Sequence, residues 1–381
     1  MRKWLAEALY QVIEKKEYSN LYLRNHLREV EEKDRALATR IFYGTLQNHA
    51  YCRHIWKAFV KRNPSKTTRI VLDMSVYQLL FLDKVPDYAV IDQAVQIVKT
   101  HHKKESGLVN AVLHKVTSRK PETMEDPWQQ LAFQTSCPNW LIKMWKAQYG
   151  EEKTIQMANS SCAILPVYVR RNACADPTLS DMFLPTETEN MYIYIGDSIT
   201  NTEEYRNGQV SVQDIGSYQI ARMVDPQPQE TILDCCAAPG TKSFAMAEMR
   251  NDQGIIHAGD IHAHRVELIK RDQQRLGIHS VIPMQLDATD CSALQDYDKI
   301  LCDVPCSGYG VLARKPDIKL HMDPQDMDTL IPLQRKIMEQ AARHLKDGGI
   351  FVYSTCTMNK KENEKQIEWF LQNHRDFILL E

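Results

Sequence analysis

Two cysteines and an aspartate stand where they could carry out covalent chemistry. Asp303 and Cys306 follow the apolar run 299–302, and Cys356 follows a second apolar run, 349–353. Each run has the length of a buried strand and is followed by turn residues. Because ligands bind at the carboxyl ends of the strands in an open α/β sheet, we expect both thiols and the carboxylate to converge on one pocket. This pattern predicts nucleophilic catalysis with a second thiol and an acid nearby.

A ligand-binding loop is predicted earlier in the chain. Residues 234–243 have the sequence DCCAAPGTKS, in which small residues and Gly240 let the backbone pass close to a ligand. Asp260 ends the next predicted strand and Asp287 ends the third. An acid at Asp260 can accept both hydroxyls of an adenosine ribose, and Asp287 is placed to meet the adenine amino group. Each acid alone could instead cap a helix, but acids at successive strand ends favour a nucleoside site.

The elements that position these residues alternate from residue 206 onward. Strand patterns occupy residues 209–212, 231–233, 254–258, 281–284, 300–302 and 349–353, and helix patterns between them include residues 243–250, 264–276 and 332–345. This alternation is typical of a parallel sheet with crossover helices. We therefore predict an α/β domain at residues 206–381.

Two further parts are predicted before it. Apolar residues at three- and four-residue spacing predict an all-helical domain at residues 1–125. A proline-containing linker at residues 121–130 leads into a small α+β connecting domain at residues 126–205. In that domain we expect helices at 139–149 and 151–160, strands at 167–171 and 192–195, and a helix after Asp176-Pro177.

Composition and charge narrow the function classes. A chain of 381 residues, 43% hydrophobic and 25% charged, is typical of a globular protein of two or three domains. Residues 1–130 contain 22 Lys and Arg against 15 Asp and Glu, whereas the remainder has 25 against 34. A basic module joined to an acidic one fits a nucleic-acid-binding appendage on a catalytic domain. The alternative is chance unevenness on solvated helix faces.

Location and metal content are expected from the same composition. The chain shows neither a signal peptide nor an apolar run of 18 residues, so we expect a cytoplasmic protein without a membrane segment. The ten cysteines are scattered and form no C-x-x-C pair, so we expect reduced thiols and no metal site.

Basic residues occur at two places where they could meet RNA. Between Arg35 and Arg69 they alternate with aromatic residues, among them Trp56, as base-stacking and phosphate-binding side chains would. The alternative is that the aromatic side chains belong to the core. Arg170 and Arg171, on a predicted strand, could meet phosphate or nothing.

Five motifs carry a resemblance to a known family. They are GQVSVQD (208–214), LDCCAAPGTKS (233–243), GDIHAHR (259–265), DVPCSGYGVLARKPDIK (303–319) and STCTMNKKENE (354–364). With them, residues 208–365 closely resemble the RNA cytosine-C5 methyltransferases that use S-adenosylmethionine. The stretch DRALATRIFYGTL (34–46) resembles the NusB-like RNA-binding domain found in one branch, the RsmB/Sun family of bacterial small-subunit (16S) ribosomal RNA methyltransferases.

The resemblance implies a fold, ligands and site residues. It implies an all-α NusB-like domain, a small α+β domain and a Rossmann-like methyltransferase domain in a monomer that acts on small-subunit ribosomal RNA, before or early in assembly. It implies Cys356 as the nucleophile and Cys306 as the thiol that helps to release the product. Contacts to S-adenosylmethionine are implied for Cys236, Ala237, Ala238, Pro239, Gly240, Thr241, Lys242, Asp260, Asp287 and Asp303.

The chemistry explains why these residue types are needed. Carbon C5 of cytosine is a poor nucleophile, but a thiolate added at C6 makes it an enamine carbon that can accept a methyl group. A free thiol has a pKa of about 8.5, so Cys356 must be activated by its surroundings. We expect Asp303, kept protonated by a water-poor pocket, to donate to N3, and Cys306 to remove the C5 proton. Lys242 is expected to position the cofactor or the substrate. The base must leave its stack to reach such a pocket.

The sequence departs from the family at two places. Thr241 stands where the family usually has a second glycine, which would crowd the methionine end of the cofactor. The family continues into a closing pair of strands where this sequence stops, after residues 377–380, so we expect either a fragment or an unpaired sheet edge.

Three alternatives remain from the sequence. Amino-group methyltransferases have an aromatic residue in the turn where this chain has Cys306. DNA cytosine methyltransferases use the cysteine of that turn as the nucleophile and lack the second motif, Thr355-Cys356. A non-catalytic RNA-binding or ribosome-assembly factor would be expected to have lost Cys306, Cys356 or Asp303.

Overall fold

The computed structural model describes residues 1–118 and 124–380, so part of the predicted linker, residues 121–123, lies outside the described residues. The chain divides into two compact units. The first, here called the helical unit, is Met1–Ile164 with Gly308–Asp323; the second, the sheet unit, is Leu165–Ser307 with Pro324–Glu381. This division differs from the three predicted domains. The segment predicted as a connecting domain, 126–205, is divided between them: its residues up to Ile164 belong to the helical unit and those from Leu165 belong to the sheet unit.

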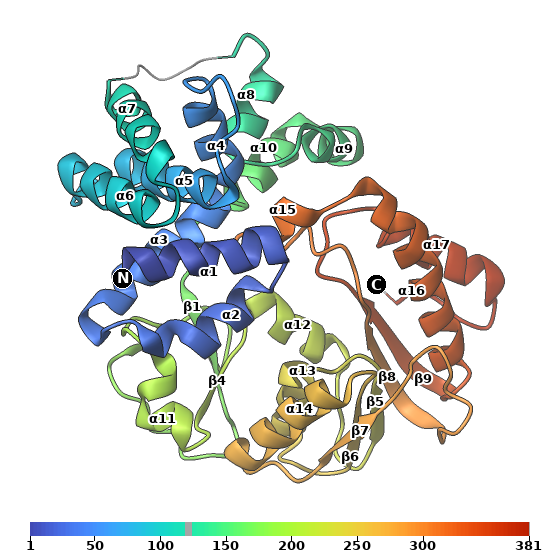
Figure 1. Cartoon of the computed structure of the whole chain (residues 1–381). Helices are drawn as coiled ribbons and strands as arrows, with labels where there is room; N and C mark the ends of the chain where they lie inside the picture. Colours follow the sequence, from blue (N-terminus) through green and yellow to red (C-terminus); the bar gives the residue numbers. More distant parts are fainter. Residues whose placement is uncertain (119–123, 381) are drawn as a thin grey trace. The chain divides into compact units, whose positions relative to one another are not determined.

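The helical unit contains only helices and connecting loops among its described residues, as the spacing of its apolar residues predicts (Figure 1). Its helices are α1 (Arg2–Lys15), α2 (Ser19–His26), η1 (Leu27–Glu29), α3 (Glu32–Gln47), α4 (His49–Lys57), α5 (Lys66–Phe81), α6 (Asp87–His101), η2 (Lys103–Glu105), α7 (Ser106–Thr117), α8 (Pro127–Gln134), α9 (Asn139–Tyr149), α10 (Glu151–Ser160) and α15 (Ile318–His321).

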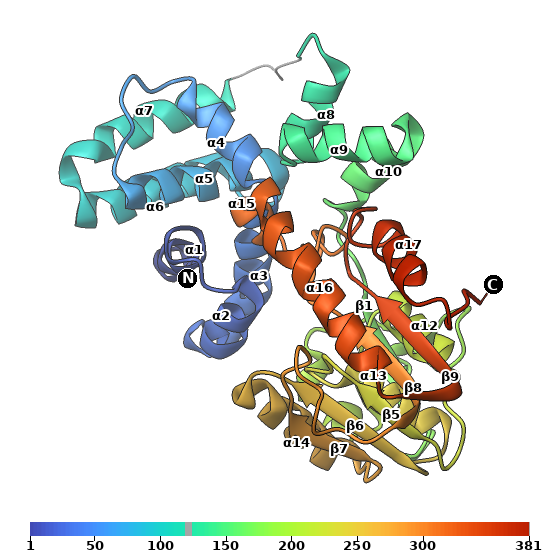
Figure 2. The ribbon, with the colours of Figure 1, turned by 90° about the vertical axis from the view of Figure 1, so that its right-hand side faces the viewer.

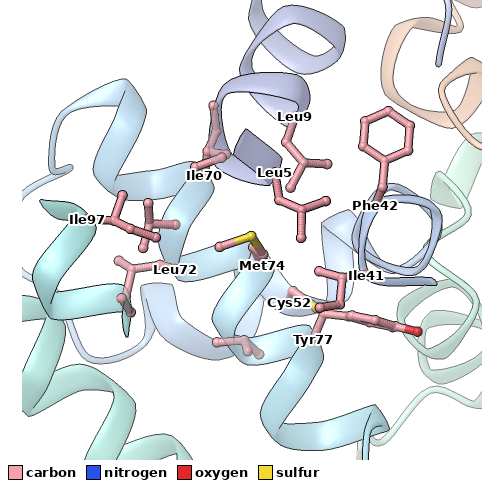
Figure 3. Close-up of a cluster of buried hydrophobic side chains, with 14 of the residues drawn as sticks. Leu5, Leu9, Ile41, Phe42, Cys52, Ile70, Leu72, Met74, Tyr77 and Ile97 are labelled. Carbon is pink, nitrogen blue, oxygen red and sulfur yellow. The ribbon is translucent and has the colours of Figure 1, made fainter. Parts of the chain in front are cut away.

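The core of the helical unit surrounds α5. Figure 3 shows Leu5 of α1, Ile41 of α3 and Cys52 of α4 near Met74 of α5, and Phe42 of α3 belongs to the same core. Residues three and four apart lie on one face of a helix, and α5 is buried on most of its circumference. The apolar pattern of residues 70–80 therefore identifies the central helix of this unit.

Trp56 belongs to this core, so the RNA-stacking interpretation is wrong for it. Its side chain is 1% exposed, and its Nε1–H donates to Oδ1 of Asp73 at 2.7 Å. Arg53 donates to Oδ2 of the same carboxylate at 2.6 Å. Burial raises the pKa of Asp73, but nearby His49 and Arg53 outweigh this effect, so the pKa lies below its ordinary value.

The segment Gly308–Asp323 packs inside the helical unit although nearly 150 residues separate it from the rest of that unit. Ser19 donates a buried hydrogen bond to Asp317. The ammonium group of Lys319, 8% exposed, donates to the carbonyl oxygen of Thr135 at 2.8 Å. The pattern of apolar residues contains no signal for this long-range packing.

The sheet unit contains two sheets and the helices that cover them (Figures 1 and 2). Its strands are β1 (Val167–Arg171), β2 (Phe183–Pro185), β3 (Met191–Tyr194), β4 (Val210–Val212), β5 (Thr231–Asp234), β6 (Ile255–Asp260), β7 (Val281–Gln285), β8 (Tyr297–Asp303) and β9 (Leu345–Ser354). Its helices are η3 (Ile199–Asn201), α11 (Glu203–Arg206), α12 (Ile215–Met223), α13 (Thr241–Met249), α14 (Ala263–Leu276), η4 (Pro324–Asp326), α16 (Met327–Ala342) and α17 (Glu364–Asn373).

The larger sheet is parallel, in the order β7-β6-β5-β8-β9, and Figure 2 shows its strands in this order. Neighbouring residues of one strand point to opposite faces. Ile232 and Leu301 accordingly pack with Phe244 of α13, whereas Leu233 and Ile300 pack on the other face, the face that α16 covers. Burial on both faces is typical of a parallel sheet. The Rossmann-like prediction is confirmed.

The smaller sheet is antiparallel, in the order β2-β3-β1-β4, and it corrects two predictions. Strand β4 pairs with β1 instead of joining the parallel sheet. The helix predicted after Asp176-Pro177 does not form. The carboxylate of Asp176 accepts the backbone N–H of Thr178 at 2.8 Å, which stabilises a local turn that competes with a helix, and β2 follows.

Arg170 of β1 forms a buried ion pair, so it is unavailable for phosphate. Arg170 and Glu248 of α13 are 1% and 3% exposed, and two nitrogens of the guanidinium donate to the carboxylate at 2.7 Å. A third bond runs from Nη1 to the carbonyl oxygen of Thr241 at 2.9 Å. Arg171 donates to Asn190. The ion pair therefore connects β1 of the smaller sheet to α13, the helix that follows the predicted ligand-binding loop.

None of the helices in the described part of the chain is both long enough and apolar enough to cross a membrane.

Candidate active site

The two thiols lie beside each other at the ends of adjacent strands. Strands β8 and β9 are in register, with Asp303 opposite Ser354. The chain continues three residues from Asp303 to Cys306 and two from Ser354 to Cys356. The two Sγ atoms are 3.2 Å apart, and the backbone N–H of Cys356 donates to Sγ of Cys306 at 3.2 Å. The parallel pairing of the two strands therefore brings both cysteines to one place.

Asp303 is held by two hydrogen-bond donors. The ammonium group of Lys242 donates to Oδ2 at 2.6 Å, and the hydroxyl of Ser354 donates to Oδ1 at 2.8 Å. The side chains of Lys242 and Asp303 are 15% and 25% exposed. Both carboxylate oxygens of Asp303 therefore accept a hydrogen bond from a neighbouring side chain.

The loop from Cys235 to Gly240 connects β5 to α13. Gly240 precedes α13 with φ 99°, a left-handed conformation that side chains rarely adopt, and a Cβ there would come within 2.8 Å of Phe244. Thr241 begins the helix and is not among the residues with positive φ, so threonine fits the backbone at this position. The exposed backbone N–H groups at a helix N-terminus favour an anionic ligand group, such as a carboxylate.

Asp260 and Asp287 lie at the ends of neighbouring strands, as predicted. Asp260 ends β6 and accepts the backbone N–H of His262 at 2.9 Å. Asp287 follows β7 and accepts two bonds from Thr289 on Oδ1, which lower its pKa below the ordinary value. These acceptors and the glycine turn fit the hydroxyls, adenine amino group and carboxylate of S-adenosylmethionine. Helix α14 follows Asp260, as the capping alternative expects, but the next element after Asp287 is β8, so Asp287 caps no helix.

Of the other cysteines in this region, Cys235 and Cys302 are buried and Cys236 is partly buried. Contact with Cys302, together with burial, raises the pKa of Cys235 well above its ordinary value, and burial similarly raises the pKa of Cys236 and Cys302. Such thiols remain protonated and unreactive. Cys306 is half-buried and Cys356 is exposed, so both are more accessible than Cys235 and Cys302.

One buried residue of the site was missed from the sequence. Glu362 is fully buried and accepts hydrogen bonds from Ser307, the residue after Cys306. It lies in the charged run NKKENE, a pattern that ordinarily indicates a solvated surface. The only signal was that this run belongs to a motif that follows the second cysteine.

Asp234, at the end of β5, gives a prediction for stability. Burial raises its pKa to about 7, and the hydroxyl of Ser243 donates to it at 2.7 Å. A carboxyl group whose folded-state pKa lies above its unfolded value contributes stability at low pH that is lost as pH rises through the folded pKa. We expect the wild-type free energy of unfolding to fall by about 3 kcal/mol between pH 5 and pH 8 through this group.

Asp234→Asn should remove this contribution to the pH dependence, because asparagine does not titrate. Urea unfolding at pH 5 and pH 8 measures it, with Asp347→Asn, at an exposed position of β9, as the control that should retain the wild-type dependence. An Asp234→Asn protein with the same pH dependence as wild type would contradict the assignment.

Two family models match the chain. The model of the 16S rRNA methyltransferase RsmB/F matches residues 221–381, and the NusB family model matches residues 1–118. Within residues 1–118 and 124–380, no group of three or more His, Cys, Asp or Glu side chains could hold a metal ion.

Curated relatives and a solved structure resemble nearly the whole chain. The probable ribosomal RNA small subunit methyltransferase B of Bacillus subtilis (strain 168) is 36% identical, covering 97% of this chain and 88% of that protein. The protein described by the same name in Synechocystis sp. is 33% identical, covering 90% and 82%. The crystal structure of PH0851 covers 97% of this chain and 88% of that chain at 25% identity, with a TM-score of 0.82.

Proposed function

Because the chain belongs to the RsmB/F family of S-adenosylmethionine-dependent methyltransferases of small-subunit ribosomal RNA, we propose that it methylates carbon C5 of a cytosine through a covalent adduct. The observation that carries the proposal is the pair of accessible thiols 3.2 Å apart beside the Lys242–Asp303 pair. Bound S-adenosylmethionine supplies an electrophilic methyl group. A thiol pair suits C5 chemistry because one sulfur adds to the ring and a second group must take the C5 proton.

Cys356 is the proposed nucleophile. Its thiolate forms a bond to C6, and the electrons of the C5–C6 double bond move toward C5 as N3 gains a proton. Exposure of Cys356 at the end of β9 supports this role, since the reacting base must reach it. The flipped-out base is stacked and hydrogen-bonded by the pocket instead of by its neighbours.

The proton for N3 is proposed to come from the Lys242–Asp303 pair. Their 2.6 Å contact is a charge-assisted hydrogen bond, and the hydroxyl of Ser354 keeps the carboxylate oriented. In this assignment Asp303 contacts the base and Lys242 supplies charge and proton, which revises the expectation of a permanently protonated aspartic acid.

Cys306 is proposed to complete the reaction. It takes the C5 proton, the C5–C6 double bond re-forms, and the electrons of the Sγ–C6 bond return to Cys356 as a thiolate. The extra proton on N3 returns to the Lys242–Asp303 pair. General-base catalysis of this kind contributes about 10²–10⁴-fold to a rate.

Nucleoside analysis tests the proposal. Unmodified small-subunit ribosomal RNA incubated with the protein and S-adenosylmethionine should yield 5-methylcytidine after digestion and mass spectrometry, whereas large-subunit RNA serves as the control. An N-methylated nucleoside would indicate the amino-group chemistry instead. RNA that binds without gaining a methyl group would indicate a binding or assembly factor.

A further inference from the structure

A buried carboxylate, Glu362, lies behind the two thiols. It is 0% exposed and accepts four hydrogen bonds, two on each oxygen. Oε1 accepts the backbone N–H of Ser307 at 2.9 Å and Nε2 of Gln334 at 3.1 Å. Oε2 accepts the hydroxyl of Ser307 at 2.6 Å and Nδ2 of Asn359 at 3.1 Å. An ionised carboxylate accepts about four bonds and donates none, so this set of donors matches it.

The network reaches the neighbours of both thiols. Ser307 follows Cys306, and its Oγ also lies 2.6 Å from Oγ1 of Thr357, which follows Cys356. A hydroxyl has one proton to donate. Because Ser307 gives its proton to Glu362, the hydroxyl of Thr357 must donate to Ser307. The carboxylate therefore sets the direction of the bond that joins the two cysteine loops.

Cys306 is held on its other side as well. Nε2 of Gln334, from α16, donates to the carbonyl oxygen of Pro305 at 3.0 Å as well as to Glu362. The hydroxyl of Tyr353, in β9, donates to the carbonyl oxygen of Glu362 at 2.7 Å. The residues before and after Cys306 thus bind one network, which is anchored to a helix and a strand.

This arrangement has an energetic cost. Among the described residues, no Lys, Arg or His side chain forms an ion pair with Glu362. A buried carboxylate without a cation is unfavourable unless hydrogen bonds compensate it. Here four donors supply that compensation, and an apolar residue or an amide at this position would leave some of them without an acceptor.

We propose that Glu362 is a positioning residue that holds Cys306 and Cys356 at the separation that adduct formation and release require. The proposal rests on the proposed function and deepens it, since it explains how two loops beyond the ends of β8 and β9 keep a fixed geometry. Displacement of a reacting group by about 1 Å can cost about 10²-fold in rate.

The test compares Glu362→Gln with Glu368→Gln, an exposed position on α17. Glutamine keeps the volume but turns an N–H₂ group toward donors. With small-subunit ribosomal RNA and S-adenosylmethionine, we expect kcat of Glu362→Gln to fall by about 10- to 100-fold, with KM for both substrates within about twofold. Glu368→Gln should match wild type. A folded Glu362→Gln protein with normal kcat, or with only a raised KM, would overturn the proposal.

A second variant tests the same network from the other side of the hydrogen bond. Ser307→Ala removes the bridge to Thr357 and leaves Glu362 in place, so it should lower kcat in the same direction even if Glu362→Gln does not fold. Combining the two should cost less than the product of the separate effects, because both act through one network. A double variant whose loss of kcat equals the product of the two separate losses would contradict a shared network.

Thiol reactivity separates this proposal from the proposed function. The rates at which iodoacetamide alkylates Cys306 and Cys356, followed by peptide mass spectrometry without RNA, should change in Glu362→Gln and not in Glu368→Gln. If wild type methylates no RNA but the alkylation rates change, the proposed function fails and the positioning role stands. Unchanged alkylation rates would overturn the positioning role.

Discussion

Replacing Cys356 by alanine is expected to abolish both methyl transfer and the covalent protein–RNA complex. Alanine has no sulfur to add to C6, so C5 stays unreactive toward a methyl donor. Loss of a nucleophile that acts as part of a catalytic group costs at least about 10³-fold. Methyl incorporation from labelled S-adenosylmethionine into small-subunit ribosomal RNA measures the rate, and denaturing gels measure the adduct.

Cys174→Ala is the matched control for this variant. Cys174 is an exposed cysteine of the sheet unit, and burial and nearby acids raise its pKa to about 11, so its loss should leave the rate unchanged. A Cys356→Ala protein that still forms the adduct would show that another thiol attacks the base. Cys306 would then be the nucleophile, as in the DNA cytosine enzymes.

Replacing Cys306 by alanine is expected to have the opposite effect on the adduct. The nucleophile remains, so Cys356 still adds to C6 and the base still gains its methyl group. Without a base beside C5, the C5 proton stays and the Sγ–C6 bond cannot break. We expect turnover to fall by about 10²–10⁴-fold while the covalent complex accumulates on denaturing gels.

The separation of the two thiols explains why Cys306→Ala distinguishes the nucleophile from the base. With the two Sγ atoms 3.2 Å apart, a base bonded to one sulfur has its C5 close to the other. The double variant, lacking both thiols, should form no complex, which confirms that the band depends on Cys356. If Cys306→Ala releases product at the wild-type rate, the proton is removed by another group and the proposed release step is wrong.

The strands of the parallel sheet could be predicted because their determinants are local. Each of β5 to β9 is an apolar run bounded by turn residues, and each crossover except that between β7 and β8 contains an amphipathic helix. Asp303 and Cys356 follow from this pattern, since a residue just past a parallel strand lies at the edge where ligands bind. The motifs that carry the family resemblance are also local, and the matches to family models and relatives confirm the family, the fold and the cofactor.

The predictions failed where distant side chains decide the structure. Strand β4 has the pattern of any short strand, and its partner β1, some 40 residues earlier, determines which sheet it joins. Arg170 and Glu362 are charged, so sequence patterns place them at the surface, yet hydrogen-bonding partners compensate their burial. Such compensation depends on the tertiary structure, which the spacing of apolar and polar residues along the sequence does not show.

The path of the chain through the two units has a consequence for the order of folding during synthesis. The helical unit begins at residue 1 but includes Gly308–Asp323, so it cannot be completed until residue 323 has been made, after β1 to β8 have already emerged. The bond from Ser19 to Asp317 closes a loop of 298 residues, and contacts so distant in sequence form slowly. The N-terminal helices are thus made first but receive their last packing partner late, and α16, β9 and α17 follow only afterwards.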